Sequence, residues 1–302
     1  MKVLMTGATG FVGRVIVRQL LAAGDEVVVL TRHVPGAALV LGSQCKFFQW
    51  KNLSELPPAE AFAGVDAVVN LVGEGIADKR WDERQKKRIY NSRIDGTRQL
   101  VLGMKAAGVK TLVSTSAVGI YGPRGDEEVT ESGKAGDDFL SSVCKDWEKE
   151  AEVAKDFGAR VAIMRVGVVL GRGGGALKKM LPIFKLGAGG PVGSGNQWMS
   201  WIHVEDLAAM YVRAVKEKSF VGAYNATSPY PAKNKDFSKV LGNVLKRPAF
   251  APAPGFMMKL VFGEMSTVLL DGQRVIPKRL HDEAHFHYRY ATLEMALKET
   301  AY

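Results

Sequence analysis

Residues 2–21, KVLMTGATGFVGRVIVRQLL, decide the fold that this chain can adopt. A short apolar run leads into a turn with glycines at Gly7, Gly10 and Gly13, and a helical pattern of apolar residues follows. Strand, tight turn and helix in this order are typical of a nucleotide-binding βαβ unit. A Cβ at Gly7 or Gly10 would obstruct the turn or a bound diphosphate, and Gly13 lets the helix pack closely. The alternative is a glycine-rich turn without a ligand.

The composition indicates a folded, soluble protein of enzyme size. The chain has 302 residues, of which 47% are hydrophobic, enough for one large core or two modest ones. Its net charge is +10, from 41 Lys and Arg against 31 Asp and Glu. The densest basic cluster, residues 79–88, also holds acidic side chains and resembles a solvated helix face. We therefore expect a small-molecule ligand and no nucleic-acid partner.

The cysteines and the apolar stretches bear on location. Cys45 and Cys144 show no metal-ligand spacing, which predicts no metal site and no disulfide framework in a reducing compartment. The N-terminus leads directly into a strand, and the most apolar late stretch, residues 255–270, is interrupted by charged residues and a glycine. We expect a cytoplasmic protein without a membrane span.

The residue after the second expected strand indicates which dinucleotide is bound. Residues 26–30 (EVVVL) form a β-rich run that ends in Thr31, Arg32 and His33. An acidic side chain at this place binds the ribose 2′-hydroxyl of NAD, whereas a positive one accommodates the 2′-phosphate of NADP. Because Arg32 has no acidic neighbour in sequence, we predict NADP(H) as the cofactor. The alternative is that Arg32 is a surface arginine at a strand end.

Strands and helices alternate along the rest of the chain. Further strands are expected at residues 46–50, 67–72, 111–116 and 161–166, and helices at about 84–108, 139–148 and 204–216. This alternation predicts an α/β fold, a Rossmann-type doubly wound parallel sheet. We expect an NADP-binding domain in residues 1–170, with return segments near 196–228. Residues 171–302, which begin with glycine-rich loops, mainly form a smaller C-terminal α+β substrate domain.

Five motifs follow one another along the chain: TGATGFVG (6–13), VVNLVG (68–73), STSAVGIYG (114–122), MRVGVVLG (164–171) and SWIHVEDLA (200–208). Together they resemble the extended short-chain dehydrogenase/reductase family of the sugar-nucleotide epimerase type. More narrowly, GEGIADKRW (73–81), SRIDGTRQLV (92–101), GSGNQWMSWIHVEDL (193–207) and GEMSTVLLDGQRVIPKRL (263–280) are similar to its YfcH-like branch, which carries a C-terminal domain of unknown function. The resemblance implies NADP(H) binding and indicates epimerase or oxidoreductase chemistry.

The resemblance also implies which residues contact the cofactor. They are Gly7, Thr9, Gly10, Phe11, Val12, Gly13, Arg32, Leu71, Val72, Gly73, Glu74, Arg93, Ser116, Cys144 and Val168. Arg93 stands where many relatives have an asparagine, and a reach toward the cofactor phosphates is its alternative role.

The family's catalytic pair is missing. In the family, a tyrosine exchanges a proton with the substrate while hydride passes to the nicotinamide, and a lysine four residues later lowers the phenol's pKa and holds the ribose. Ser116 matches the serine of this set. In the expected helix at 139–148, either Ser141 and Lys145 or Leu140 and Cys144 occupy the pair's places. The apolar stripe through Cys144 favours the second alignment and puts Lys145 on the surface.

Two substitutes for the tyrosine stay open. Tyr121 would supply a phenol, although the matching tyrosine in relatives more often shapes the substrate pocket, and Cys144 would be a nucleophile, although a buried cysteine is usually inert. The candidate substrate contacts are Arg80, Trp81, Arg165, Met199, Trp201 and His203. The two arginines would clamp a carboxylate or phosphate. The alternative is that the tryptophans are core residues and that His203 only satisfies backbone groups.

Two functions therefore compete. The first is an NADP-dependent oxidoreductase or epimerase with a rewired proton-transfer group, and its catalytic candidates are Ser116 and Tyr121. The second is a non-catalytic NADP(H)-binding sensor or scaffold, linked to cell division by the names of some relatives. The sequence leaves a monomer and a homodimer open, since relatives often pair through the two long helices.

Overall fold

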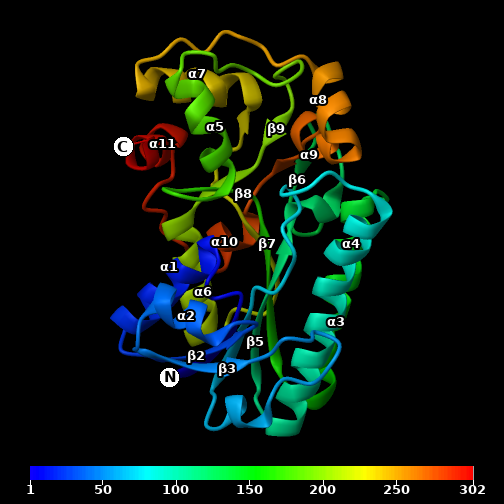
Figure 1. The fold of residues 1–302 in the computed structure, drawn as a ribbon, viewed down its shortest axis with the longest axis vertical. Helices are drawn as coiled ribbons and strands as arrows, with labels where there is room; N and C mark the ends of the chain where they lie inside the picture. Colours follow the sequence, from blue (N-terminus) through cyan, green and yellow to red (C-terminus); the bar gives the residue numbers. More distant parts are fainter. Residues whose placement is uncertain (302) are drawn as a thin grey trace.

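A parallel sheet forms the centre of the protein (Figure 1). The computed structural model describes residues 1–301, in which seven strands pair in parallel in the order β11-β7-β5-β4-β1-β2-β3. Their bounds are β1 Lys2–Thr6, β2 Glu26–Thr31, β3 Cys45–Gln49, β4 Ala67–Asn70, β5 Thr111–Ala117, β7 Arg160–Val166 and β11 Gly222–Ala226. The chain order reverses between β1 and β4, and ligands of such sheets bind at the carboxyl ends of the strands there. The predicted Rossmann-type doubly wound fold is confirmed.

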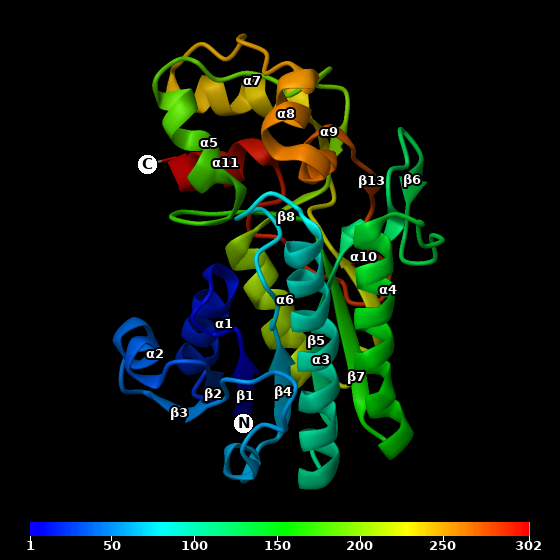
Figure 2. The same ribbon diagram turned by 45° about the vertical axis from the view of Figure 1, so that its right-hand side comes forward.

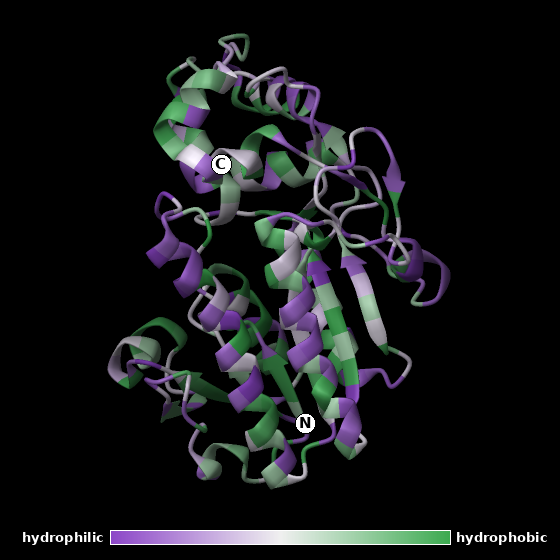
Figure 3. Cartoon of the chain, turned by 90° about the vertical axis from the view of Figure 1, so that its right-hand side faces the viewer, coloured by the Kyte–Doolittle hydropathy of each residue, from purple (hydrophilic) through white to green (hydrophobic). Residues whose placement is uncertain are grey.

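Successive side chains of each strand point to opposite faces of the sheet. Because the strands are apolar on both faces, helices cover both. In β1, Val3 and Met5 belong to the core on one face, and Leu4 belongs to the core on the other. The covering helices are α1 (Phe11–Ala22) and α6 (Val204–Lys216) on the first face, and α3 (Glu83–Ala107) and α4 (Phe139–Glu152) on the second (Figure 2). Hydrophobic residues follow the sheet, and hydrophilic ones lie on the helices that cover it (Figure 3).

A third core lies beyond the carboxyl edge of the sheet, in the upper part of Figure 1. Its buried members include Trp201, Phe237 and Leu297. The elements that contribute to it are β8 Val168–Leu170, α5 Gly175–Lys185, β9 Trp198–Met199, β10 Trp201–His203, β12 Ala232–Lys233, α7 Asn234–Leu245 and α11 Leu293–Ala301. The other helices and strands are α2 Val34–Leu41, β6 Glu128–Val129, α8 Gly255–Phe262, α9 Thr267–Leu270, β13 Arg274–Val275 and α10 Lys278–Asp282.

The segment near 196–228 contributes to both parts of the molecule. Its β10 pairs with β8, its helix α6 packs against α1, and β11 extends the main sheet beside β7. The sequence pattern did not predict β11, because its residues GAYNA lack a β-branched run. The other strands and helices that were expected at stated residues form within two residues of their predicted starts, whereas α1 begins at Phe11, inside the glycine turn.

The part of the chain that the structure describes has neither a membrane-crossing helix nor a cluster of metal-ligating side chains. Across residues 1–301, no helix combines the length and the hydropathy that a membrane crossing requires. The same residues contain no group of three or more His, Cys, Asp or Glu side chains arranged to hold a metal ion.

Candidate functional site

The glycine turn between β1 and α1 is closed by contacts that leave no room for side chains. Gly7 has a φ of +63°, and a Cβ there would lie 2.7 Å from the carbonyl oxygen of Leu71 at the end of β4. The Gly10 amide donates to the carbonyl of Gly7 over 3.0 Å. A Cβ on Gly13 would lie 2.7 Å from Ala8 Cα, so Gly13 is required by the turn itself rather than by the strand.

The first turn of α1 leaves its backbone donors open. Gly10, the N-cap residue before α1, provides no capping side chain, and the first turn of α1 holds no acidic residue. The first N–H groups of a helix have no partner within the helix, and the helix dipole favours an anion there. The turn therefore offers the donors that a diphosphate binds.

Phe11 joins this turn to the glycine-rich loop at residues 171–175. A Cβ on Gly171 would lie 2.7 Å from Phe11 Cζ, and one on Gly175 would lie 3.1 Å from its Cε1. A Cβ on Gly174 would overlap the ring. These glycines let the loop lie directly against the start of α1.

A buried polar network fixes the strand ends beneath the turn. Thr6 Oγ1 donates to Asn70 Oδ1 over 2.8 Å, and Asn70 Nδ2 donates to Thr97 Oγ1 over 2.8 Å. The indole of Trp147 on α4 donates to the same Thr97 oxygen over 2.9 Å. Each of these side chains is buried, so losing one partner would leave an unsatisfied polar group. The network ties β1, β4, α3 and α4 together.

An open cavity of about 410 Å³ lies between the end of β2, the loop after β3 and helix α3. It is lined by Arg32, Asn52, Leu53, Ser54, Glu74, Arg88, Asn91, Ser92 and Asp95. Arg32 and Glu74 were predicted from sequence. The loop residues and the α3 residues were not, because they meet only when α3 packs beside the loop. Arg88 adds a second guanidinium to the same cavity.

The loop after β4 is held to α3. The Glu74 amide donates to Ser92 Oγ over 2.9 Å, and Arg93 Nη1 donates to the Glu74 carbonyl over 3.0 Å. Gly73, which directly precedes Glu74, is exposed. Among the other predicted cofactor contacts, Thr9 is exposed, and Val12, Leu71, Val72 and Val168 are half-buried near the same edge.

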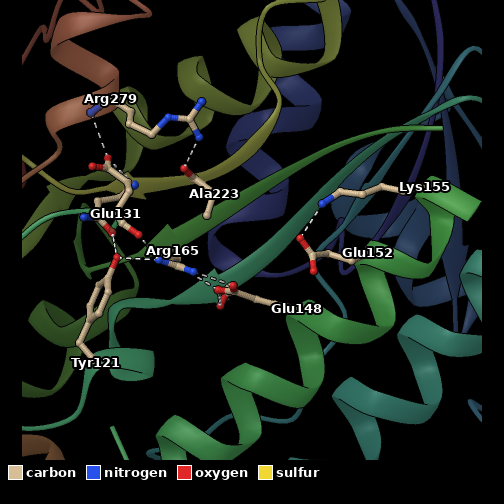
Figure 4. A network of polar contacts seen from close by, with 10 residues as sticks. Tyr121, Glu131, Glu148, Glu152, Lys155, Arg165, Ala223 and Arg279 are labelled. Carbon is tan, nitrogen blue, oxygen red and sulfur yellow. Dashed lines mark hydrogen bonds and ion pairs between the residues drawn. The ribbon is translucent and has the colours of Figure 1, made fainter. Parts of the chain in front are cut away.

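Tyr121 lies in a buried polar network (Figure 4), and Ser116, the other catalytic candidate, is buried and joins that network through Glu148. The Tyr121 hydroxyl donates to Asn225 Oδ1 over 2.6 Å and accepts from Arg165 Nη1 over 2.9 Å. Ser116 Oγ donates to Glu148 Oε1 over 2.6 Å, and the same carboxylate pairs with Arg165 over 2.9 Å. Burial raises the pKa of Tyr121. Both hydroxyls are thus bonded within the protein and enclosed by it.

Helix α4 presents Cys144 inward and Lys145 outward, as its apolar stripe predicts, but it also buries Ser141, which the stripe placed on the polar side, while Leu140 is half-buried. Burial, together with the negative charge of Glu148, raises the pKa of Cys144 to about 12. The thiol is therefore neutral at physiological pH and a poor nucleophile. Leu140 lies beside Gly119, whose Cβ would be 3.5 Å from that of Leu140.

Trp81 and Trp201 have partners within the protein. The Trp81 indole donates to the Ile76 carbonyl over 2.7 Å, and its ring meets Phe139 edge to face. Trp201 is fully buried, and its indole donates to the Tyr230 carbonyl over 2.9 Å. The core-packing alternative fits both tryptophans.

The remaining substrate candidates differ in access. His203 is buried, its Nδ1 accepts from the Glu205 amide, and its Nε2 faces Glu299 at 3.0 Å. Burial lowers the pKa of His203 despite that carboxylate. Met199 is half-buried, and its sulfur accepts from Asn234 Nδ2. Arg165 is engaged with Glu148, whereas Arg80 is exposed.

The glycine turn, the open helix start and the adjoining cavity define a doubly wound α/β protein with the phosphate turn of dinucleotide-binding folds. Comparison with known proteins gives a narrower answer. The chain belongs to the NAD dependent epimerase/dehydratase family, whose model matches residues 3–226. A domain of unknown function, DUF1731, matches residues 253–300, in agreement with the resemblance to the YfcH-like branch.

Relatives of this kind occur in bacteria, plants and animals. The chloroplastic epimerase family protein SDR39U1 homolog of Arabidopsis thaliana is 40% identical over 99% of this chain and 86% of its own length. Epimerase family protein YfhF of Bacillus subtilis is 38% identical over 99% of this chain and 97% of its own length. The crystal structure of human epimerase family protein SDR39U1 with NADPH has a TM-score of 0.89 at 37% identity, covering 100% of this chain and 99% of that one.

Proposed function

We propose that this chain is an NADP(H)-dependent oxidoreductase of the epimerase type that acts on a small organic substrate. The observation that carries the proposal is the uncapped start of α1 beside a cavity that holds Arg32 and Arg88. The human relative solved with NADPH supports the choice of cofactor. When bound, the nicotinamide supplies hydride exchange with a substrate carbon. We also propose a cytoplasmic location, with the plastid of the Arabidopsis relative as the alternative compartment.

Different residues of the chain bind the diphosphate and the 2′-phosphate of NADP(H). The N–H groups at the start of α1 bind the diphosphate, and the glycine turn lets it approach. Arg32, next to Arg88 in the cavity, binds the 2′-phosphate and so selects NADP(H) over NAD(H). Phe11 holds the loop at residues 171–175 against this turn, which excludes water from the diphosphate.

Titration calorimetry with NADPH and NADH tests the cofactor. We expect Arg32→Gln to weaken NADPH binding about tenfold to a hundredfold, the worth of a charge-assisted bond, and to leave NADH binding unchanged. Arg84→Gln is the matched control, because Arg84 lies exposed on α3 and does not line the cavity. A wild-type protein that binds neither dinucleotide, or that prefers NADH, would contradict the proposal.

Turnover tests the enzymatic part. The protein is incubated with NADPH and a panel of nucleotide sugars, carbonyl compounds and quinones, and oxidation of NADPH is followed by absorbance. We expect turnover with at least one class. Tight NADPH binding without turnover of any class would count against an enzyme.

A second function is favoured by the catalytic candidates themselves. Ser116 and Tyr121 are buried with their hydroxyls bonded to protein, and helix α4, where the family's tyrosine and lysine are expected, contains no tyrosine. A non-catalytic NADP(H) sensor or scaffold, with a role near cell division, needs none of these groups. A protein partner that binds in the presence of NADPH but not of NADP⁺ would support this function, and binding indifferent to the redox state would weaken it.

A further inference from the structure

Arg93 on α3 is a cation in which only one of the three guanidinium nitrogens donates a hydrogen bond within residues 1–301. Its Nη1 donates to the carbonyls of Glu74 and Ile89, each over 3.0 Å. Its guanidinium lies over the indole of Trp147, with Cζ 5.1 Å from the ring centroid. Nε and Nη2 donate to no acceptor within residues 1–301, and no carboxylate of those residues lies within ion-pair distance.

The unused edge of Arg93 lies at the carboxyl end of β4. A Cβ on Gly73 would be 3.1 Å from Nη2 and 3.3 Å from Nε. Gly73 is exposed and follows Leu71, whose carbonyl closes the turn at Gly7. The two free donors are therefore next to the candidate site, on the side of α3 and α4.

The surroundings of Arg93 do not neutralise its charge. Burial lowers the pKa of Arg93, but a guanidinium stays protonated in proteins. Cys144 on α4 is a neutral thiol because burial raises its pKa to about 12, and the carboxylate of Glu74 acts on Arg93 only from beyond ion-pair distance. A half-buried cation with two idle donors is costly, and a ligand with paired oxygen acceptors would remove that cost.

The position of Arg93 indicates which part of a ligand it meets. In a doubly wound sheet, β1 to β3 bind one nucleotide, and the half that begins with β4 binds the other. The cavity at Arg32 belongs to the first half, and the start of α1 provides donors for the diphosphate between them. Arg93 belongs to the second half, beside α4.

We propose that the free edge of Arg93 donates two hydrogen bonds to the vicinal hydroxyls of the nicotinamide ribose and so positions the nicotinamide ring. The inference rests on the proposed binding of NADP(H). Two parallel N–H donors on one planar edge match two neighbouring oxygens. Arg93 is a positioning residue, because it holds the ribose and not the reacting atoms.

Three ligands of increasing length test the proposal by calorimetry. They are 2′-phospho-ADP, which ends at the diphosphate, 2′-phospho-ADP-ribose, which adds the second ribose, and NADPH. We expect Arg93→Gln to weaken the two ribose-containing ligands about tenfold to a hundredfold and to leave 2′-phospho-ADP unchanged. Arg93→Lys keeps the charge and should lose less. Arg98→Gln is the control, since Arg98 lies on the same helix but pairs with Glu150 at the surface.

Each other outcome overturns the proposal. Equal affinity of wild type and Arg93→Gln for all three ligands removes Arg93 from the site. A loss that includes 2′-phospho-ADP assigns the contact to the diphosphate. If urea unfolding shows that Arg93→Gln does not fold, Arg93→Lys takes its place: a smaller loss confined to the two ribose-containing ligands supports the proposal, and no loss, or a loss that includes 2′-phospho-ADP, overturns it. Wild-type protein that binds none of the ligands refutes the proposed function, whereas a wild type that binds them with an indifferent Arg93 refutes this inference alone.

Discussion

Gly13 lies where a single methyl group decides whether the turn forms. In the interior of a helix, alanine is better than glycine by about 1 kcal/mol. At this position the added Cβ meets the backbone of Ala8 at 2.7 Å and overlaps the carbonyl of Gly7. Backbone atoms cannot move aside as the end of a flexible side chain can, so the steric effect outweighs the helical preference.

We therefore expect Gly13→Ala to lower the free energy of unfolding by about 1–3 kcal/mol, the usual cost of overpacking, and to abolish NADPH binding. Urea unfolding and calorimetry measure the two effects. Gly255→Ala is the control, because its Cβ would meet nothing nearer than 3.5 Å and Gly255 begins α8. We expect that change to stay within about 0.5 kcal/mol. A Gly13→Ala protein as stable as wild type would show that the turn has room.

The thiol of Cys144 should be unreactive in the folded protein. Burial raises its pKa to about 12 from the ordinary 9.0 of a thiol, so the native state keeps the proton where the unfolded chain loses it. The stability that this group contributes is present below pH 9 and is lost as the pH rises toward 12. In a Cys45→Ala background, we expect iodoacetamide to label Cys144 only after urea unfolding. Rapid labelling of the native protein would contradict this and would make Cys144 a candidate nucleophile again.

At the scale of elements, the parts read correctly from sequence are those fixed by local pattern. Continuous apolar and β-rich runs predicted the strands, and the glycine spacing predicted the turn before α1. The register of α4 followed from its apolar stripe, which Cys144 continues and Lys145 does not. Each of these features depends on residues that are neighbours along the chain.

The parts that sequence missed depend on residues that are far apart in the chain. Asn52 and Arg88 share a cavity only because α3 packs beside the loop after β3. The hydrogen-bond partners of Arg165 and Tyr121 come from α4 and β11. The sequence spacing therefore could not predict that their polar groups are already bonded within the protein. Tertiary packing decides which polar residues face a ligand and which face each other.

The outer surfaces of α3 and α4 predict a monomer. Their exposed side chains are mainly basic, with Arg84, Lys87, Arg88, Lys105, Lys145 and Lys149 against Glu83 and Glu152, and the exposed apolar residues in the two helices are limited to Leu102 and two alanines. A twofold contact through these helices would oppose like charges without an apolar centre. We expect sedimentation velocity to give a single species of about 33 kDa, close to the 32.8 kDa of the chain. A dimer would contradict this, and glutamate in place of Lys145 and Lys149 would then locate the contact.

At the scale of the whole molecule, the C-terminal segment, residues 253–300, contributes side chains to four separate hydrophobic clusters, two of which are small ones around Trp81 and Tyr121. Met265 packs with Trp81, and Val275 packs with Tyr121. Leu280 belongs to the core on the α1 and α6 face of the sheet, and Leu297 belongs to the third core. A segment that enters four cores has no core of its own, although its family model is separate from that of residues 3–226.

Because its cores share one segment, the molecule should unfold as one cooperative unit. We expect Leu280→Ala, a change at a fully buried side chain, to cost about 2–5 kcal/mol and to shift the loss of far-ultraviolet circular dichroism and of tryptophan fluorescence together. Leu260→Ala is the matched control, since that leucine is 74% exposed on α8 and its loss should change stability by less than about 0.5 kcal/mol. If the two signals separated in Leu280→Ala, the segment would be stabilising only the part of the sheet that it touches.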